Sequence, residues 1–345
     1  MRATTIHSPY DIRVEDVPDP GIRQPGDAVV QVLRACVCGT DLWAYRGESA
    51  RQPGQRLGHE FLGTVTDIGA DVTTLRPGDL VVAPLSWSDG ACVYCAEDLP
   101  SSCPNGGIWG AVGSDGGQGE AVRVPYADST LVKLPADAAS DERLLTALLT
   151  LADVLGTGYH AAVSAGARPG ASVAVVGDGA VGLCAVMAAG MLGAENIFIL
   201  GRHPARLELA GKFGATAAVT ERGDAAVEAV RELTGGHGVH ASIEAAGTAE
   251  ARHTAIAATR PGGAVGWVGA PHGSALDTGM LFIRSITLRG GIAPVRVHIP
   301  ALLPSILDGT IDPSPVFDAE VTLDAVADGY QAMNARTALK VVVTP

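Results

Sequence analysis

Three side chains that lie far apart in the sequence are of the types that bind a catalytic zinc ion. They are Cys38, His59 and Asp153. A thiolate, an imidazole and a carboxylate suit zinc and leave one coordination position open for a substrate oxygen. An ion held in this way polarises a carbonyl group, or lowers the pKa of a bound alcohol so that an alkoxide exists near neutral pH. Because these residues are so distant along the chain, only a folded domain can bring them together.

A glycine-rich motif in the second half of the chain has the pattern of a dinucleotide-binding loop. It follows a predicted strand, 173–176, and opens an apolar segment of helical length. In a GxGxxG motif the first glycine allows a tight turn, the second lets a pyrophosphate approach the backbone, and the third lets helix and strand pack closely. The helix N-terminus then faces the phosphates. The residues predicted to contact the cofactor are Gly177, Gly179, Ala180, Val181 and Gly182.

The end of the next predicted strand indicates which dinucleotide binds. An acidic side chain there normally accepts hydrogen bonds from the ribose hydroxyls of NAD. In this chain that position is Gly201, followed by Arg202 and His203. The missing carboxylate removes repulsion toward a 2′-phosphate, and a guanidinium can bind such a phosphate with two hydrogen bonds. We therefore predict NADP(H), bound by these three residues; the alternative is that Arg202 is a solvated surface residue and Gly201 merely a strand end.

Together these strings resemble the zinc-dependent alcohol dehydrogenases of the medium-chain dehydrogenase/reductase superfamily, over the whole chain and in the order of that family. The resemblance implies that Cys38, not Cys36, is the zinc ligand, because the family's ligand precedes a Gly-Thr/Ser-Asp sequence. It implies that Glu60, next to His59, is an outer or exchangeable ligand of the metal. It also implies that Thr40 hydrogen-bonds the alcohol oxygen and begins the removal of its proton.

Two further features of the resemblance concern the substrate. Asp153, within an Asp-x-x-x-Thr-Gly string, is similar to the third ligand of bacterial secondary alcohol dehydrogenases, which use NADP. The His that usually continues the proton relay is replaced by Trp43, and an indole cannot accept a proton at neutral pH, so the relay must end at water or at another group. Trp43, Trp87 and Trp109 are the candidates for apolar walls of the substrate pocket, which would favour ketones and secondary alcohols. Packing in the core is the alternative for each of them.

Three cysteines near residue 100 follow the spacing of the family's structural zinc lobe. Cys92, Cys95 and Cys103 match the last three positions of its four-cysteine pattern, and Asp89 stands at the first. A carboxylate oxygen binds zinc at a distance similar to that of an imidazole nitrogen, so we expect a structural zinc held by one Asp and three Cys. The alternative is an empty lobe with free thiols. The small residues of 89–106 would be poorly ordered without a metal.

The order of the predicted elements indicates two domains. Before about residue 130, short apolar runs alternate with Gly, Pro and Asp turns, which predicts an antiparallel, barrel-like sheet. Its predicted strands are 28–33, 63–68, 80–83 and 120–124. After a predicted helix at 141–151, strands alternate with helices, as in a parallel, doubly wound sheet. The predicted strands of this sheet are 172–176, 196–200, 217–219, 239–244, 264–268 and 286–290.

The expected fold class is therefore α/β, and the resemblance makes the first domain a GroES-like β-barrel and the second a Rossmann domain. The tail carries a predicted helix at 300–307 and a strand at 339–343, and in the family such a tail returns to the first domain. The predicted domains are thus a discontinuous catalytic domain and a dinucleotide-binding domain. Their bounds are 1–152 with 293–345 for the former and 153–292 for the latter.

Composition restricts the partners of the chain. Its net charge of −13, from 37 acidic and 24 basic residues, argues against nucleic acid or an anionic membrane as a partner and favours a small-molecule substrate. The uncharged run 179–194 is too short to span a membrane, so we expect a buried helix there. The N-terminus lacks an apolar secretory core, and without export the six cysteines fit metal ligands better than disulfides. We predict a cytoplasmic protein.

The sequence thus predicts a zinc-dependent oxidoreductase that interconverts alcohols, above all secondary ones, and ketones or aldehydes by hydride transfer with NADP(H). A polyol or sugar dehydrogenase of the same family is one alternative. A non-catalytic NADPH-binding protein with a structural or regulatory role is another, although the joint presence of Cys38, His59 and Asp153 argues against it. The resemblance also implies a homodimer or homotetramer, joined through an edge strand such as 286–290.

Overall fold

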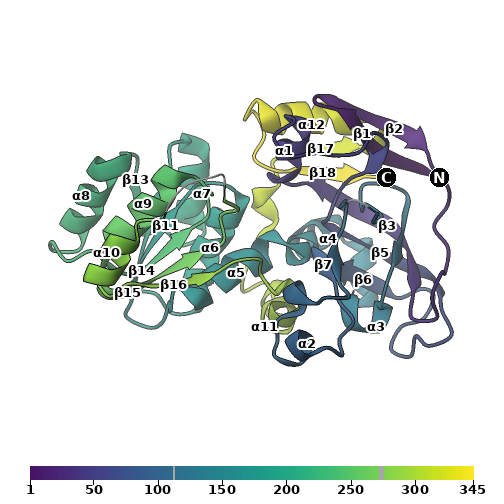
Figure 1. Ribbon diagram of the computed structural model, residues 1–345, viewed down its shortest axis with the longest axis horizontal. Helices are drawn as coiled ribbons and strands as arrows, with labels where there is room; N and C mark the ends of the chain where they lie inside the picture. Colours follow the sequence, from purple (N-terminus) through teal and green to yellow (C-terminus); the bar gives the residue numbers. More distant parts are fainter. Residues whose placement is uncertain (112, 272–275) are drawn as a thin grey trace. The chain divides into compact units, whose positions relative to one another are not determined.

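The computed structural model describes residues 1–111, 113–271 and 276–345 of the chain. Contacts between residues divide it into two units. One unit comprises Met1–Asp153 and Pro294–Pro345, and the other comprises Val154–Ala293. The first unit therefore consists of two segments that are distant in sequence, and the second is a continuous insertion between them (Figure 1).

The first unit is organised around one long strand, β3 (Ala28–Val37). The antiparallel β5 (Phe61–Ile68) pairs along one of its edges, while β9 (Ala121–Val124) and β18 (Val341–Thr344) pair with successive parts of the other. β17 (Ala319–Thr322) adds to β18 in parallel, so the C-terminal segment completes the sheet. The remaining strands of this unit are β1 (Arg2–Ser8), β2 (Asp11–Asp16), β4 (Gln55–Arg56), β6 (Leu80–Ala83), β7 (Ser86–Trp87), β8 (Gly107–Ile108) and β10 (Val132–Lys133).

These strands form a seven-stranded sheet and two smaller ones. The large sheet has the order β10-β6-β5-β3-β18-β17, with β9 also on β3; β2-β1-β4 and β7-β8 form the others. Val30, Phe61, Val122 and Tyr330 belong to the continuous apolar core beneath them and have almost no exposed surface. β-Branched and aromatic side chains suit such a pleated, buried surface. The helices of this unit are α1 (Asp41–Tyr45), α2 (Val93–Ala96), α3 (Ala127–Thr130), α4 (Glu142–Leu149), α11 (Val295–Leu307) and α12 (Val326–Asn334).

The second unit is a parallel six-stranded sheet with the order β13-β12-β11-β14-β15-β16. Counted along the chain this is 3-2-1-4-5-6, the order of a Rossmann domain. Its strands are β11 (Ser172–Val176), β12 (Asn196–Leu200), β13 (Ala217–Val219), β14 (Val239–Glu244), β15 (Thr259–Trp267) and β16 (Thr287–Gly290). The predicted α/β class with a doubly wound sheet is confirmed.

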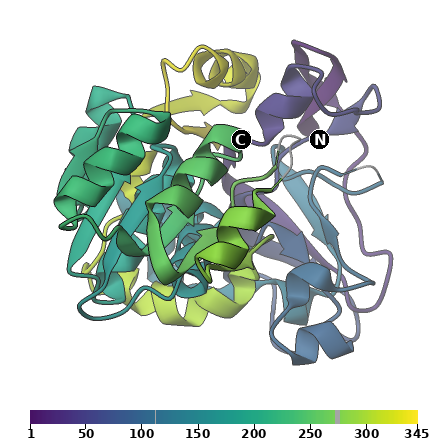
Figure 2. The ribbon, with the colours of Figure 1, turned by 60° about the vertical axis from the view of Figure 1, so that its left-hand side comes forward.

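Helices cover both faces of this sheet. α5, α6 and α7 pack together on one face, and α8, α9 and α10 on the other. Figure 2 turns this unit toward the viewer, with the green helices α9 and α10 in front of the sheet. The bounds of the helices are α5 (Val154–Ser164), α6 (Ala180–Met191), α7 (Pro204–Lys212), α8 (Gly223–Leu233), α9 (Ala249–Ala258) and α10 (Thr278–Ile283).

The first four strands of the Rossmann sheet have the predicted bounds, but β3, β15 and α11 are much longer than predicted. β3 continues past Arg34 because the distant β18 pairs with its last residues. β15 begins five residues early, at Thr259, because it pairs with β14 across a register shift. α11 begins at Val295, not at Pro300, because a buried apolar stripe continues through the exposed proline. In each case a tertiary contact extends an element beyond its local sequence signal.

The uncharged run 179–194 forms α6, in which eight residues are buried. This agrees with the predicted buried helix. Throughout the described ranges, every helix is too short or too polar to cross a bilayer.

Candidate catalytic metal centre and cofactor loop

The structure brings Cys38, His59, Glu60 and Asp153 into one cluster within the first unit. One ligand atom of each lies within 4.8 Å of the ligand atoms of the other three, and all four side chains are buried or nearly so. β3 and β5 are antiparallel, so Cys38, just past the end of β3, lies beside the two residues that precede β5. Asp153 comes from the turn between α4 and α5. Strand pairing therefore explains how Cys38 meets His59 and Glu60, and the turn before α5 adds Asp153.

His59 is oriented by Asp41, to which the sequence analysis assigned no role. Its Nδ1 lies 3.4 Å from Asp41 Oδ1, while its Nε2 lies 3.5 Å from Asp153 Oδ2 and 3.9 Å from Glu60 Oε1. The second oxygen of Asp41, Oδ2, accepts the backbone N–H of Cys38 at 3.0 Å. One carboxylate thus fixes both the ring and the loop, and directs Nε2 toward the other acidic groups.

The acidic side chains of the cluster favour a cation among them. Burial alone would lower the pKa of His59, but the neighbouring Cys38, Asp41 and Asp153 outweigh it and raise that pKa well above its usual value. Glu60 Oε2 is buried and has no hydrogen-bond partner among the described residues. A divalent ion would compensate these negative groups, satisfy the unpaired oxygen and replace the proton on His59. The donor set therefore fits zinc.

Glu60 is paired on its other side with Lys340, a residue that the sequence analysis did not consider. Lys340 Nζ donates to Glu60 Oε1 at 2.6 Å, and the two side chains are 1% and 0% exposed. Burial opposes the charge of the ammonium, but the acidic groups around it raise the pKa of Lys340 well above its usual value. Lys340 immediately precedes β18, whose pairing with β3 sets it beside the metal centre. No local motif marks it, because its partner is distant in sequence.

Asp41 is itself held in place by a buried chain of polar contacts. Gln118 Nε2 donates to the carbonyl oxygen of Cys36 at 3.0 Å and approaches Asp41 Oδ2 at 3.4 Å. The Tyr330 hydroxyl donates to Gln118 Oε1 at 2.9 Å. In the sequence analysis, only Asp41 of this network belonged to a motif, the Gly-Thr-Asp sequence that follows Cys38.

The remaining residues predicted around the substrate lie at the start of α1, on β7 and in the core. Thr40 is exposed, and its hydroxyl lies 3.3 Å from Cys38 Sγ. Trp43 is half-buried on α1. Trp109 is only 2% exposed, donates from Nε1 to the Pro84 carbonyl at 2.7 Å and packs against Phe61, so the alternative of core packing describes its place. Trp87 is half-buried against Trp109, with ring centroids 4.8 Å apart.

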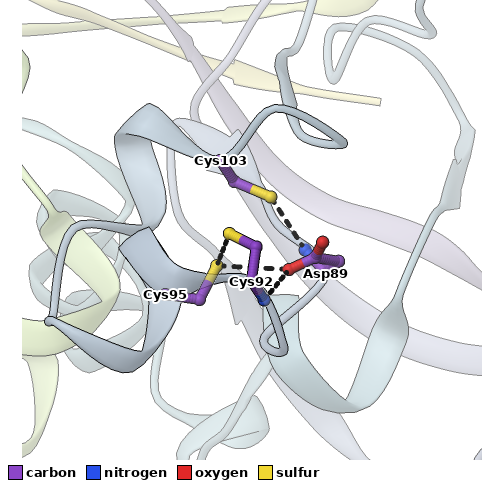
Figure 3. A group of neighbouring side chains, drawn as sticks. All are labelled: Asp89, Cys92, Cys95 and Cys103. Carbon is purple, nitrogen blue, oxygen red and sulfur yellow. Dashed lines mark hydrogen bonds between the residues drawn. The ribbon is translucent and has the colours of Figure 1, made fainter.

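Asp89, Cys92, Cys95 and Cys103 form the second cluster of possible metal ligands, again with ligand atoms within 4.8 Å of one another (Figure 3). Cys92 Sγ lies 3.5 Å from Cys95 Sγ, and the latter lies 3.4 Å from Asp89 Oδ1. Asn105 Nδ2 donates to Asp89 Oδ2 at 2.6 Å and helps to keep the pKa of that carboxyl far below its usual value. Burial and hydrogen bonds raise the pKa of the Cys95 thiol to about 12. The lobe is thus arranged around thiols that zinc would deprotonate.

In the second unit, the glycine-rich motif connects β11 to α6. A Cβ on Gly182 would lie 1.9 Å from the Gly177 carbonyl oxygen, so only glycine allows this approach of helix and strand. A Cβ on Gly179 would meet no atom within 4 Å, so the backbone there faces open space. Ala180 and Val181 begin α6. This open, glycine-lined helix start fits a pyrophosphate.

The three residues predicted to select the dinucleotide lie beside this loop. Val176 is opposite Leu200 in the parallel pairing of β11 and β12, so both loops emerge at the same edge of the sheet. Gly201 and Arg202 follow β12, and His203 stands at the N-cap position of α7. Arg202 is exposed, and its guanidinium pairs with no carboxylate of the described chain.

Comparison with known proteins places this site in a family. The model described as an alcohol dehydrogenase GroES-like domain matches residues 24–136, and the one described as a zinc-binding dehydrogenase matches residues 180–307. A probable zinc-binding alcohol dehydrogenase of Mycobacterium tuberculosis is 37% identical over 98% of this chain and 86% of that protein. The glutathione-independent formaldehyde dehydrogenase of Pseudomonas aeruginosa is 32% identical over 100% and 97%.

A solved structure gives the same result. The alcohol dehydrogenase of Thermus sp. ATN1 is 34% identical, with a TM-score of 0.90 over 100% of this chain and 99% of that one. This chain therefore belongs to the zinc-type alcohol dehydrogenases of the medium-chain dehydrogenase/reductase superfamily, a family of oxidoreductases that use zinc and a nicotinamide cofactor. The expected GroES-like first domain is confirmed.

Replacement of Lys340 tests the buried pair. We expect Lys340→Met to lower the free energy of unfolding by about 3–5 kcal/mol, because it leaves the buried Glu60 without its partner. Urea denaturation of the zinc-loaded protein measures this. Lys212→Met is the matched control: its pair with Glu208 is exposed, and such pairs contribute at most about 1 kcal/mol. Equal effects of the two substitutions would contradict the assignment.

The second cluster predicts a structural zinc. We expect Asp89→Ala to remove one zinc per subunit and to lower the melting temperature, because three thiols alone leave the tetrahedral site incomplete. Asp89→Cys restores a four-thiolate set and should retain the ion. Elemental analysis of the purified variants measures the stoichiometry. A wild-type protein with no more zinc than Asp89→Ala would show that this lobe holds no metal.

Proposed function

We propose that this chain is an NADP(H)-dependent dehydrogenase that interconverts secondary alcohols and ketones at the cluster of Cys38, His59, Glu60 and Asp153. The observation that carries the proposal is the meeting of these four side chains in one buried, negatively charged site. Cys38, His59 and Asp153 would hold zinc, with Glu60 as an outer or exchangeable ligand. Bound zinc supplies a Lewis acid for the substrate oxygen, and the nicotinamide accepts or donates the hydride.

The chain's own groups position this chemistry and move the proton. Asp41 fixes the ring of His59 through Nδ1, so that Nε2 is the atom presented to the metal site. The Thr40 hydroxyl, which lies beside Cys38 Sγ, can accept the alcohol proton and donate its own. Trp43, which follows on α1, carries only an N–H donor. The proton therefore passes from Thr40 to water or to another group.

Features of the substrate site and of the cofactor loop support the proposed substrate class, secondary alcohols and ketones, and the proposed cofactor, NADP(H). An Asp in the third ligand position is similar to that of secondary alcohol dehydrogenases, and the half-buried Trp43 and Trp87 could provide apolar contacts for a ketone substituent. Gly201 contributes no carboxylate side chain, and Arg202 offers an unpaired guanidinium to a 2′-phosphate. A relative that is a formaldehyde dehydrogenase makes small aldehydes a further substrate class to test.

We expect Asp153→Ala to lose its catalytic zinc and at least about 100-fold in rate, because the site loses a ligand. The measurement is zinc per subunit together with NADPH oxidation on ketones, aldehydes including formaldehyde, and keto sugars. Asp71→Ala, on an exposed loop, is the matched control and should behave as the wild type. Faster turnover of sugars than of simple ketones would favour the polyol dehydrogenase. NADPH binding without any turnover would favour the non-catalytic protein.

We also propose that the chain forms a homo-oligomer in the cytoplasm, through the edge of the Rossmann sheet. β16 is an edge strand, and near it Phe282 and Ile283 are 87% and 82% exposed, while Ile292 is 58% exposed. Apolar side chains so exposed typically mark an interface. A second copy of this chain fits, because an edge strand can pair with its own copy across a two-fold axis.

We expect the double variant Phe282→Asp with Ile283→Asp to be monomeric, because charges would be buried in the interface. Light scattering after size-exclusion chromatography gives the mass. Leu233→Asp, at an exposed apolar position on α8 of the same unit, is the matched control and should leave the mass unchanged. A wild-type protein that is already monomeric would refute the interface.

A further inference from the structure

The space in front of Gly201 is occupied by the side chain of Asp178, from the glycine-rich loop. A Cβ on Gly201 would lie 2.5 Å from Asp178 Cβ, 2.7 Å from Oδ2 and 2.8 Å from Cγ. Any side chain at position 201 would therefore collide with this carboxylate. The missing acidic residue at the end of β12 thus has a structural explanation that is independent of the cofactor.

Asp178 is firmly held in this place. Its Oδ2 accepts the backbone N–H groups of Arg202 at 2.8 Å and of His203 at 2.9 Å, and lies 2.8 Å from His203 Nδ1. The side chain is 11% exposed. Burial alone would raise the pKa of Asp178, but these hydrogen bonds outweigh it and lower the pKa, so the group is an anion near neutral pH.

If the adenosine ribose binds beside Arg202, as proposed above, this carboxylate lies next to its 2′ position. The N–H groups at the start of α7 are natural donors to an anion. Here the N–H groups of Arg202 and His203 already donate to Asp178 Oδ2. Its other oxygen, Oδ1, accepts no hydrogen bond within the described chain. That oxygen is available to a ribose hydroxyl, whereas its charge would repel a phosphate.

We propose that Asp178 is a specificity-determining residue that takes over, from the glycine-rich loop, the carboxylate missing from the end of β12, and so limits the preference for NADP(H). This rests on the proposed binding of the adenosine ribose beside Arg202. Two opposed groups then act on the 2′ position. The Arg202 guanidinium attracts a phosphate, and Asp178 repels it while accepting a hydroxyl of NAD(H).

The His203 contact provides the rival explanation. If Asp178 served to hold His203 as a protonated donor to the 2′-phosphate, its loss would weaken NADPH binding. The two explanations predict opposite signs for the same substitution, so a binding measurement separates them.

The test uses Asp178→Asn in the full-length, zinc-loaded protein. The Asn side-chain oxygen can still accept both backbone N–H groups, so the loop should keep its form. Calorimetric titration gives dissociation constants for NADPH, NADH, 2′,5′-ADP and 5′-AMP. We expect the ratio of the NADH constant to the NADPH constant to rise about tenfold or more, and the two nucleotide fragments to shift in the same sense. Asp224→Asn, an exposed Asp on α8, is the control and should leave the ratio unchanged.

A lower ratio in Asp178→Asn, or an unchanged ratio with no general loss of affinity, would overturn the inference. Should this variant weaken all four ligands alike, Asp178→Ala decides: a ratio that still does not rise overturns the inference. Arg202→Gln reports separately on the proposed cofactor and should weaken NADPH and 2′,5′-ADP only. If Arg202→Gln weakens neither of them, the NADP(H) proposal fails, whatever Asp178 does.

Discussion

The first unit depends on a group of buried acidic side chains around one imidazole. Cys38, Asp41, Glu60 and Asp153 all approach His59, in a place where water cannot screen them. Such a cluster is costly unless cations compensate it. The chain supplies one fixed cation, Lys340, to one side of Glu60. A proton on His59 or a bound ion can supply the rest of the compensation, and the exchange of that proton for an ion is the physical reason that this site fits a metal.

The strands of the first unit bring most of these charged groups together around His59. β3 places Cys38, β5 follows His59 and Glu60, and β18 follows Lys340, so three strands of one sheet carry all of the site except Asp153. Since β18 lies in the second segment, the first unit needs both segments on either side of the Rossmann insertion. The Asp89 lobe is different: its side chains are exposed or half-buried, and a metal can order it where an apolar core is lacking.

In the second unit, a carboxylate that usually comes from the end of β12 comes from the glycine-rich loop, and this changes what the glycine at position 201 indicates. A glycine at the end of β12 normally indicates the loss of a carboxylate, yet Asp178 brings one to the same place from the neighbouring loop. On the functions proposed above, selection between NAD(H) and NADP(H) would depend on the balance between this anion and Arg202. A prediction from the residue type at position 201 alone misses this balance, because a residue of another loop supplies the charge at the same location.

The sequence by itself determined the features whose signals are local. Contiguous residues define these features, so they could be predicted without the structure. They are the GxGxxG loop between β11 and α6, the first four strands of the Rossmann sheet and the sequence motifs around Cys38, His59 and Asp153. The tertiary structure decided what depends on distant partners: the ends of β3 and α11, the burial of Trp109, and the contacts of Asp41, Lys340 and Asp178. These residues have ordinary local surroundings, and they gain a role only when strand pairing brings a charge from elsewhere within hydrogen-bonding distance.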